Sequence, residues 1–206
     1  MKKTMVDEKI EKILVDQDIL QFLKEVYFGN FADPLLAASS RAYRDMNRTI
    51  RFHGVADEVR WNLRNQVNQV LREQVAWLTP QNIKSARDFD SWHQEVCSQI
   101  KRIYAAQGIT LTYGQAQKWV NMTIKYLYML EANDFAGIFQ YLHVPLDNYI
   151  FDIAHDALGI ARPKQAWSRW DNYQDQYLQY QYLLRAKLGS QAPLRWEFRN
   201  WRTPEK

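Results

Sequence analysis

Apolar side chains recur along most of this chain at the three- and four-residue spacing of amphipathic helices. The clearest segment runs from Thr112 to Leu130, and Thr112 with Gln115 fits the capping box that begins a helix. No segment alternates strictly enough to predict a strand, so the pattern predicts an all-α fold, a compact multi-helix domain. The other helices are expected over residues 5–28, 34–50, 55–77, 89–106, 145–158 and 171–188.

Glycine and proline separate these segments. Gly29 and Gly159 are placed to end helices, whereas Asp33-Pro34 and Pro145 are placed to begin them. Neither an internal repeat nor a charged linker divides the chain, and 206 residues suit one domain. We therefore expect a single all-α domain over residues 1–206, with 1–80 and 81–206 as the two helical lobes around a cleft if the domain is divided.

Composition excludes several classes of function. One cysteine among 206 residues excludes an internal disulfide framework, and the four histidines show no metal-binding spacing, so neither a metal nor a cofactor is expected. The glycine motifs of phosphate loops and dinucleotide-binding folds are missing. No apolar run approaches the roughly 20 residues of a membrane helix, and the first residues lack an apolar signal core. We therefore expect a cytoplasmic protein with no membrane partner.

Positive charge is concentrated in one stretch. Residues 41–72 hold seven arginines and three acidic residues, a net +4 that equals the formal charge of the whole chain. Four arginines are spaced 3-4-3 and are expected on one face of one helix: Arg41, Arg44, Arg48 and Arg51. Each guanidinium can donate to two phosphate oxygens, so this row predicts contacts with the DNA backbone. The alternative is a solvated helix face, or arginines paired with acidic residues elsewhere.

A second basic segment lies near the C-terminus, where Trp196, Phe198 and Trp201 alternate with arginines. Such a segment could stack nucleobases and hold phosphates. It could also form a strap that buries its aromatic rings on the core. We favour the strap, because large aromatic side chains rarely stay exposed together.

Two short segments carry candidate chemistry. In 111–121, a turn containing Gly114 opens a helix and puts Lys118 in its early turns; in 143–147, proline fixes the backbone and Asp147 lies at the mouth of another helix. The positive end of a helix dipole favours the neutral amine, which is the nucleophilic form of lysine. Free N–H groups at a helix start stabilise a carboxylate. Facing one pocket, these two groups could attack a sugar carbon and stabilise the oxocarbenium ion that develops.

The two segments resemble the helix-hairpin-helix DNA glycosylase superfamily, particularly its bifunctional 8-oxoguanine branch. Gly114 to Lys118 is similar to the hairpin and lysine of that family, and Val144-Pro145-Leu146-Asp147 is similar to its Val-Pro-Val-Asp segment. The resemblance covers about residues 111–155. The hairpin has one glycine where the family usually has two, and the gap of 29 residues between Lys118 and Asp147 is longer than in most members.

The resemblance implies a DNA repair enzyme that flips a modified base out of the duplex and cleaves its N-glycosidic bond. Lys118 would attack C1′ and form a Schiff base that allows strand cleavage, and Asp147 would stabilise charge on the sugar. Gly114 would contact the DNA backbone, and Tyr113 and Trp119 would stack on the base if they are not part of the core.

The alternative is a non-enzymatic helical module that binds nucleic acid or protein. Lys118 would then be solvated and Asp147 would only cap its helix. Lys125, two helical turns after Lys118, is expected to be a solvated lysine and to be dispensable for the reaction. The separation of Lys118 from Asp147 in the folded chain discriminates between the two.

Overall fold

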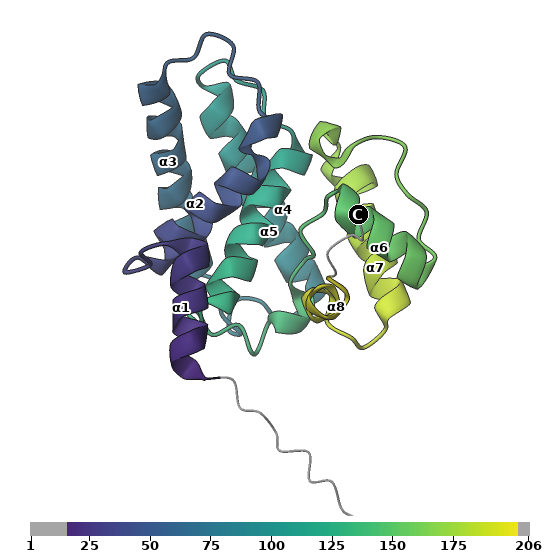
Figure 1. The fold of residues 1–206 in the computed structure, drawn as a ribbon. Coiled ribbons are helices and arrows are strands. Elements are labelled where there is room, and N and C mark those ends of the chain that lie inside the picture. Colours follow the sequence, from purple (N-terminus) through teal and green to yellow (C-terminus); the bar gives the residue numbers. More distant parts are fainter. Residues whose placement is uncertain (1–15, 202–206) are drawn as a thin grey trace, which may run out of the picture.

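The computed structural model describes residues 16–201, and every regular element in that range is a helix (Figure 1). This confirms the all-α prediction for the described residues. The α-helices are α1 (Gln17–Phe28), α2 (Pro34–Met46), α3 (Asp57–Ala76), α4 (Ala86–Ala105), α5 (Tyr113–Met129), α6 (Asn148–Leu158), α7 (Gln179–Leu188) and α8 (Pro193–Asn200). The shorter elements are the 3-10 turns η1 (Asn47–Thr49), η2 (Phe139–Tyr141) and η3 (Trp167–Arg169), and the π-helical segment η4 (Tyr173–Leu178), which continues into α7.

Capping side chains determine where several helices begin. Thr112 and Gln115 form the predicted capping box at the start of α5, with both hydrogen bonds present. Asp16 accepts a hydrogen bond from the backbone of Asp18, so α1 begins inside the predicted 5–28 segment, whose first part lies outside the described residues. The helix predicted from Pro145 begins three residues later, because Asp147 is its N-cap.

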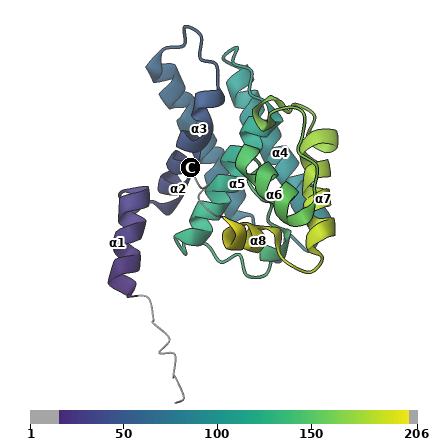
Figure 2. The ribbon, with the colours of Figure 1, turned by 45° about the vertical axis from the view of Figure 1, so that its right-hand side comes forward.

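The central helix of the molecule is α5, which is buried along almost its whole length (Figures 1 and 2). On one side of α5, α2 and α4 pack along it, and α3 packs on both α2 and α4. Elsewhere α5 contacts η3 and η4, which lie next to α6, α7 and α8. The buried apolar side chains form one cluster that reaches from Phe28 to Trp196. This core is continuous across residue 80, where the two lobes were expected to meet.

The position of Gly114 shows why α5 needs a glycine in its first turn. The N–H of Gly114 donates to the carbonyl of Trp170 over 2.9 Å. A Cβ atom at Gly114 would lie 1.7 Å from the carbonyl oxygen of Trp167. The close backbone approach that glycine allows is therefore to η3 of the same chain. The DNA contact predicted for Gly114 is wrong, because its surroundings are already filled by protein.

Replacement of Gly114 by alanine should destabilise the fold, because η3 must move to admit the methyl group. We expect a loss of about 1–3 kcal/mol in the free energy of unfolding, measured by urea denaturation. Met129→Ala, at the exposed end of the same helix, is the control and should cost less. Equal stability of Gly114→Ala and wild type would show that η3 does not constrain α5.

Candidate functional site

Lys118 and Asp147 are in direct contact. Lys118 is the sixth residue of α5, and its Nζ lies 2.7 Å from Oδ2 of Asp147, the N-cap of α6. The other carboxylate oxygen of Asp147 accepts the N–H of Ile150 over 2.9 Å. The lysine side chain is 6% exposed and the aspartate side chain 20%. Asp147 therefore serves two groups at once, the start of α6 and a nearly buried ammonium group.

Two glutamines hold the backbone that leads to Asp147. The amide of Gln117 on α5 donates to the carbonyl of Leu146 over 2.9 Å and accepts its N–H over 3.2 Å. The amide of Gln181 on α7 forms the same pair of bonds with Val144, at 2.7 and 3.3 Å. The side chains thus satisfy an extended backbone as a neighbouring strand would. The backbone just before Asp147 is therefore held by side chains from α5 and α7.

A cleft of about 620 Å³ opens at the Lys118–Asp147 pair. Its lining comes from α1, α2, η1, α5 and α8 and contains five basic and two acidic side chains, a net charge of +3 (five minus two). An anion would therefore be attracted into the cleft. Besides Lys118 and Asp147, the lining residues are Tyr27, Arg41, Arg44, Asp45, Arg48, Met122, Lys125, Tyr126, Met129, Phe198 and Trp201.

The arginine row follows the cleft only in part. The helix expected to carry it ends at Met46, where the hydroxyl of Thr49 donates to the Met46 carbonyl and the chain turns into η1. The prediction of one row on one helix face is therefore wrong. Arg41 and Arg44 lie on α2 and Arg48 lies on η1, and all three line the cleft. Arg51 lies beyond η1 and lines a neighbouring hollow.

The arginines of the cleft differ in their partners. Arg41 is half-buried, with its guanidinium 4.2 Å from the ring centre of Tyr27 and its Nε 4.0 Å from Asp45. Arg44 and Arg48 are exposed, and neither forms an ion pair with a described residue. These two arginines are the ones available to an anionic ligand.

A second buried ion pair borders the cleft, which its lysine, Lys125, also lines. Nζ of Lys125 is 2.5 Å from Oε1 of Glu197 on α8, and the two side chains are 10% and 1% exposed. Burial raises the pKa of the Glu197 carboxyl, and its Oε2 has no hydrogen-bond partner among the described residues. Lys125 was expected to be solvated, but it is nearly buried and paired; it lies about two turns after Lys118 and hence on the same helix face. The cleft therefore contains two amines.

The basic C-terminal segment acts as a strap in part. Trp196 is buried in the core and Phe198 packs against it. Trp201 is 49% exposed and lines the cleft. The Lys125 ammonium lies 4.9 Å from the ring centre of Trp201 and 5.3 Å from that of Phe198. The pair with Glu197 and these ring contacts hold α8 against α5.

The aromatic residues predicted to stack on a base do not line this cleft. Trp119 is 1% exposed, and its indole N–H donates to Ser39 over 2.9 Å within the core. The hydroxyl of Tyr113 hydrogen-bonds with Ser98 over 3.0 Å, and the Lys101 ammonium lies 3.9 Å from the centre of its ring. The base-stacking role predicted for Trp119 is therefore wrong, because its ring is buried in the core, whereas the role of Tyr113, which is half-buried outside this cleft, stays a prediction. Among the described residues, the aromatic lining of the cleft is Tyr27, Tyr126, Phe198 and Trp201.

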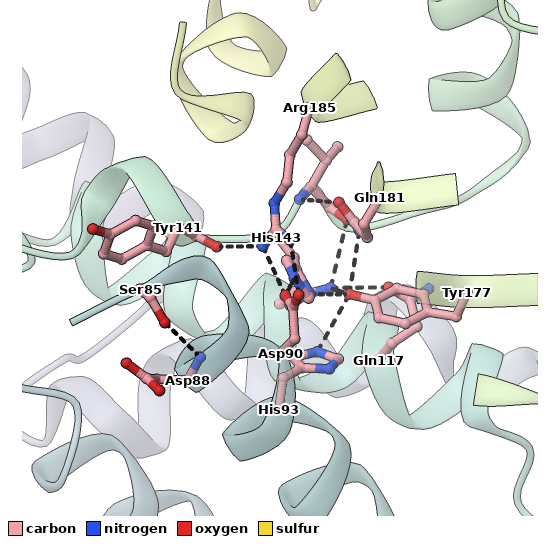
Figure 3. A network of polar contacts seen from close by, with 12 residues as sticks. Ser85, Asp88, Asp90, His93, Gln117, Tyr141, His143, Tyr177, Gln181 and Arg185 are labelled. Carbon is pink, nitrogen blue, oxygen red and sulfur yellow. Dashed lines mark hydrogen bonds and ion pairs between the residues drawn. The ribbon is translucent and has the colours of Figure 1, made fainter. Parts of the chain in front are cut away.

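A buried polar network supports the other end of the 143–147 segment (Figure 3). Nε2 of His143 lies 2.7 Å from Asp90 on α4, which also receives two guanidinium hydrogen bonds from Arg185 on α7, at 2.8 and 2.9 Å. Nδ1 of His143 hydrogen-bonds with the hydroxyl of Tyr177 over 2.7 Å, and this hydroxyl also contacts His93. The network joins α4, η4 and α7 to the segment that ends at Asp147.

The network fixes the charges of its members. Burial alone would raise the pKa of Asp90, but the hydrogen bonds from His143 and Arg185 outweigh it and lower that pKa to about 2. Burial lowers the pKa of His143 to about 4, against the opposing effect of Asp90. The imidazole is therefore neutral near neutral pH, and the carboxylate is charged. No group of three or more metal-ligating side chains in residues 16–201 is arranged to hold a metal ion.

Comparison of the chain with models of protein families, with curated proteins and with solved structures found no match. None of the helices in the described range is long and apolar enough to cross a membrane. The resemblance over residues 111–155 therefore stays a prediction, and the functional argument depends on the geometry of the cleft.

Folding stability should fall as the pH is lowered from about 6.5 to about 4. His143 binds its proton near pH 4 in the fold but near 6.5 in the unfolded chain, so acid favours unfolding. Its contribution is on the order of 3 kcal/mol, and buried His93, whose pKa is also lowered by burial, acts in the same direction. Below about pH 4, protonation of Asp90 adds a further loss, down to about pH 2.

Urea unfolding of wild type across this pH range measures the effect. His143→Gln should reduce the pH dependence between about 6.5 and 4 without abolishing it, because the variant loses the imidazole of His143 and keeps that of His93. A wild type that is as stable near pH 4.5 as near pH 7 would contradict the assignment of a neutral buried histidine.

Proposed function

We propose that this chain is a DNA-binding glycosylase and lyase, in which Lys118 attacks the sugar of a modified nucleotide and Asp147 is its partner. The observation that carries the proposal is the 2.7 Å contact between these two side chains at a positively charged cleft. A solvated lysine and an aspartate that only caps a helix would not need to meet in one cleft.

The geometry supports a proton transfer within the pair. Attack needs a neutral amine, and Oδ2 of Asp147 is within hydrogen-bond distance of Nζ of Lys118. The proton passes from Nζ to Oδ2, and the nitrogen lone pair then forms the bond to C1′. The electron pair of the glycosidic bond leaves with the base, which takes up the proton held by Asp147. Once ionised again, Asp147 stabilises the positive charge on the nitrogen now bonded to C1′ and passes one of its protons to O4′, so that the sugar ring opens to the protonated Schiff base.

The dimensions of the cleft suit one nucleotide. A volume of about 620 Å³ lies within the range of pockets that hold a single small ligand and is far below the volume of a duplex. A base would therefore have to leave its stack to reach Lys118. Arg44 and Arg48 are placed to neutralise the phosphates beside it, and Trp201 offers an exposed ring for stacking.

Borohydride reduction in the presence of DNA that carries a modified base should trap a covalent complex of wild type. Lys118→Gln should abolish trapping, because the amine is lost while an N–H remains to bond Asp147. The panel should include oxidised, deaminated and alkylated bases. Lys125→Gln with Glu197→Gln removes the second ion pair of the cleft without leaving a buried charge, and this double variant should still trap.

Lys164→Gln, at an exposed lysine outside the cleft, is the surface control. Trapping by Lys118→Gln that is lost in the Lys125 and Glu197 double variant would assign the nucleophile to Lys125. The absence of trapping by wild type across the whole panel would overturn the enzymatic proposal and favour the interaction module.

Binding to duplex DNA that contains a stable abasic-site analogue should weaken as salt rises, because phosphate contacts release counterions. Arg44→Gln with Arg48→Gln should lower the slope of log affinity against log salt by about 2. Arg102→Gln is the control, because Arg102 is paired with Glu95 and lies outside the cleft lining. Binding that does not depend on salt would contradict the role of these arginines.

A further inference from the structure

A second and larger hollow, of about 830 Å³, lies beside the cleft. Its walls are η1 with the loop after it, the turn between α4 and α5, and η3. Three side chains give it positive charge: Arg48, Arg51 and Arg169. Its described lining contains neither aspartate nor glutamate. We call this feature the arginine hollow.

The three arginines of the hollow have no counter-charge beside them. Arg48, Arg51 and Arg169 are exposed, and none of them pairs with a carboxylate of the described residues. Other exposed arginines are of both kinds: Arg102 pairs with Glu95 and Arg162 with Asp152, whereas Arg44 has no carboxylate partner among the described residues. Like charges gathered without a counter-charge repel one another. The hollow is therefore suited to an anion with several charges.

The walls of the hollow are held together by α5. The amide of Gln115 donates to the carbonyl of Thr49 over 2.7 Å, which ties η1 to α5. The hydroxyl of Thr112 donates to the carbonyl of Ser168 over 2.9 Å, which ties η3 to the same helix end. A site whose walls are fixed before binding loses less conformational entropy when it binds.

The lining favours phosphates over bases. It offers guanidinium, hydroxyl and amide donors, but no phenylalanine, tyrosine or tryptophan on which a base could stack. Arg48 lines both the arginine hollow and the cleft. A chain of phosphates that leaves the cleft at Arg48 therefore enters the hollow next.

We propose that the arginine hollow binds consecutive backbone phosphates of the nucleic-acid strand on one side of the nucleotide held in the cleft. The proposal rests on the proposed function for the identity of the ligand, but it does not depend on catalysis by Lys118. It adds a binding site that extends from Arg48 to Arg51 and Arg169. It also predicts that the protein contacts more phosphates on one flank of the bound nucleotide than on the other.

The test measures equilibrium binding of the full chain to a fluorescent duplex with a central abasic-site analogue. Arg51→Gln with Arg169→Gln should weaken binding about 10-fold or more. The matched control is Arg102→Gln with Arg162→Gln, which removes the same charge from paired arginines outside the hollow and should change affinity much less. Arg51→Lys with Arg169→Lys keeps the charge and should recover part of the affinity. Urea midpoints of all variants should match wild type, because these side chains are exposed.

Neutral methylphosphonates then locate the contact. Placed on one flank of the analogue, they should weaken binding by wild type, and the Arg51 and Arg169 double variant should be insensitive to them. The same substitution on the other flank should affect both proteins alike. Equal losses in the two double variants, equal sensitivity of wild type and variant on each flank, or tight binding of inorganic tripolyphosphate with no binding of DNA would each overturn the proposal.

The two proposals can fail separately. Weakened binding in the Arg51 and Arg169 variant, with no borohydride trapping by wild type, would support the hollow and overturn the enzymatic function. Trapping that depends on Lys118, with unchanged binding by the Arg51 and Arg169 variant, would do the reverse.

Discussion

The structure depends on one constraint: the polar side chains buried along α5 must be hydrogen-bonded or ion-paired with other parts of the chain. A central helix in a small domain is surrounded by other elements, yet α5 carries Gln115, Gln117, Lys118, Asn121 and Lys125. An unsatisfied polar group in such a place costs more than a hydrogen bond returns, and an unpaired charge costs more still. Gln115 bonds to η1, Gln117 and Lys118 bond to the 143–147 segment, Asn121 bonds to Tyr177 of η4, and Lys125 pairs with Glu197 of α8, so these bonds position all four segments.

The same demand accounts for the composition of the cleft. Two lysines on one face of α5 each need a carboxylate, and the chain supplies Asp147 from a helix start and Glu197 from the last helix. Both pairs are poorly screened by water, so they are sensitive to the loss of one partner. Polar chemistry and folding are thus coupled at this site. Apolar replacement of a whole buried ion pair is often neutral or stabilising, so the stability of the fold alone does not account for these charges.

The sequence was most informative where the signal is local. Helix periodicity and the capping box of Thr112 and Gln115 depend on neighbours within one or two turns, and the structure confirms them. The end of α2 at Met46 was missed, because a threonine hydroxyl three residues later competes for its carbonyl. Trp119 was misassigned, because an aromatic residue near a helix start has the same sequence pattern whether it faces a cleft or the core. The helical spacing of Lys118 and Lys125 did contain the information that they share a face.

What the sequence could not give is the set of long-range partners. Glu197 lies 72 residues from Lys125, and Arg185 lies 95 residues from Asp90. Single acidic and basic residues are too common for one such pair to be recognised among many. The hydrogen bonds of Gln181 with Val144 and of Gln117 with Leu146 leave no signal in the sequence either, because they are made to backbone groups that every residue possesses. The juxtaposition of Lys118 and Asp147 was the exception, since a motif resemblance brought the two together in advance.

The position of Glu197 has a consequence for synthesis of the protein. Ribosomes deliver the chain from the N-terminus, so α5 and its two lysines emerge long before α8 does. Until Glu197 has been made, Lys125 cannot form its ion pair, and the part of the cleft wall formed by Phe198 and Trp201 is missing. The cleft is therefore assembled last, when the rest of the core is already available. A nascent chain can fold much of its interior without yet displaying a complete site to any ligand in its surroundings.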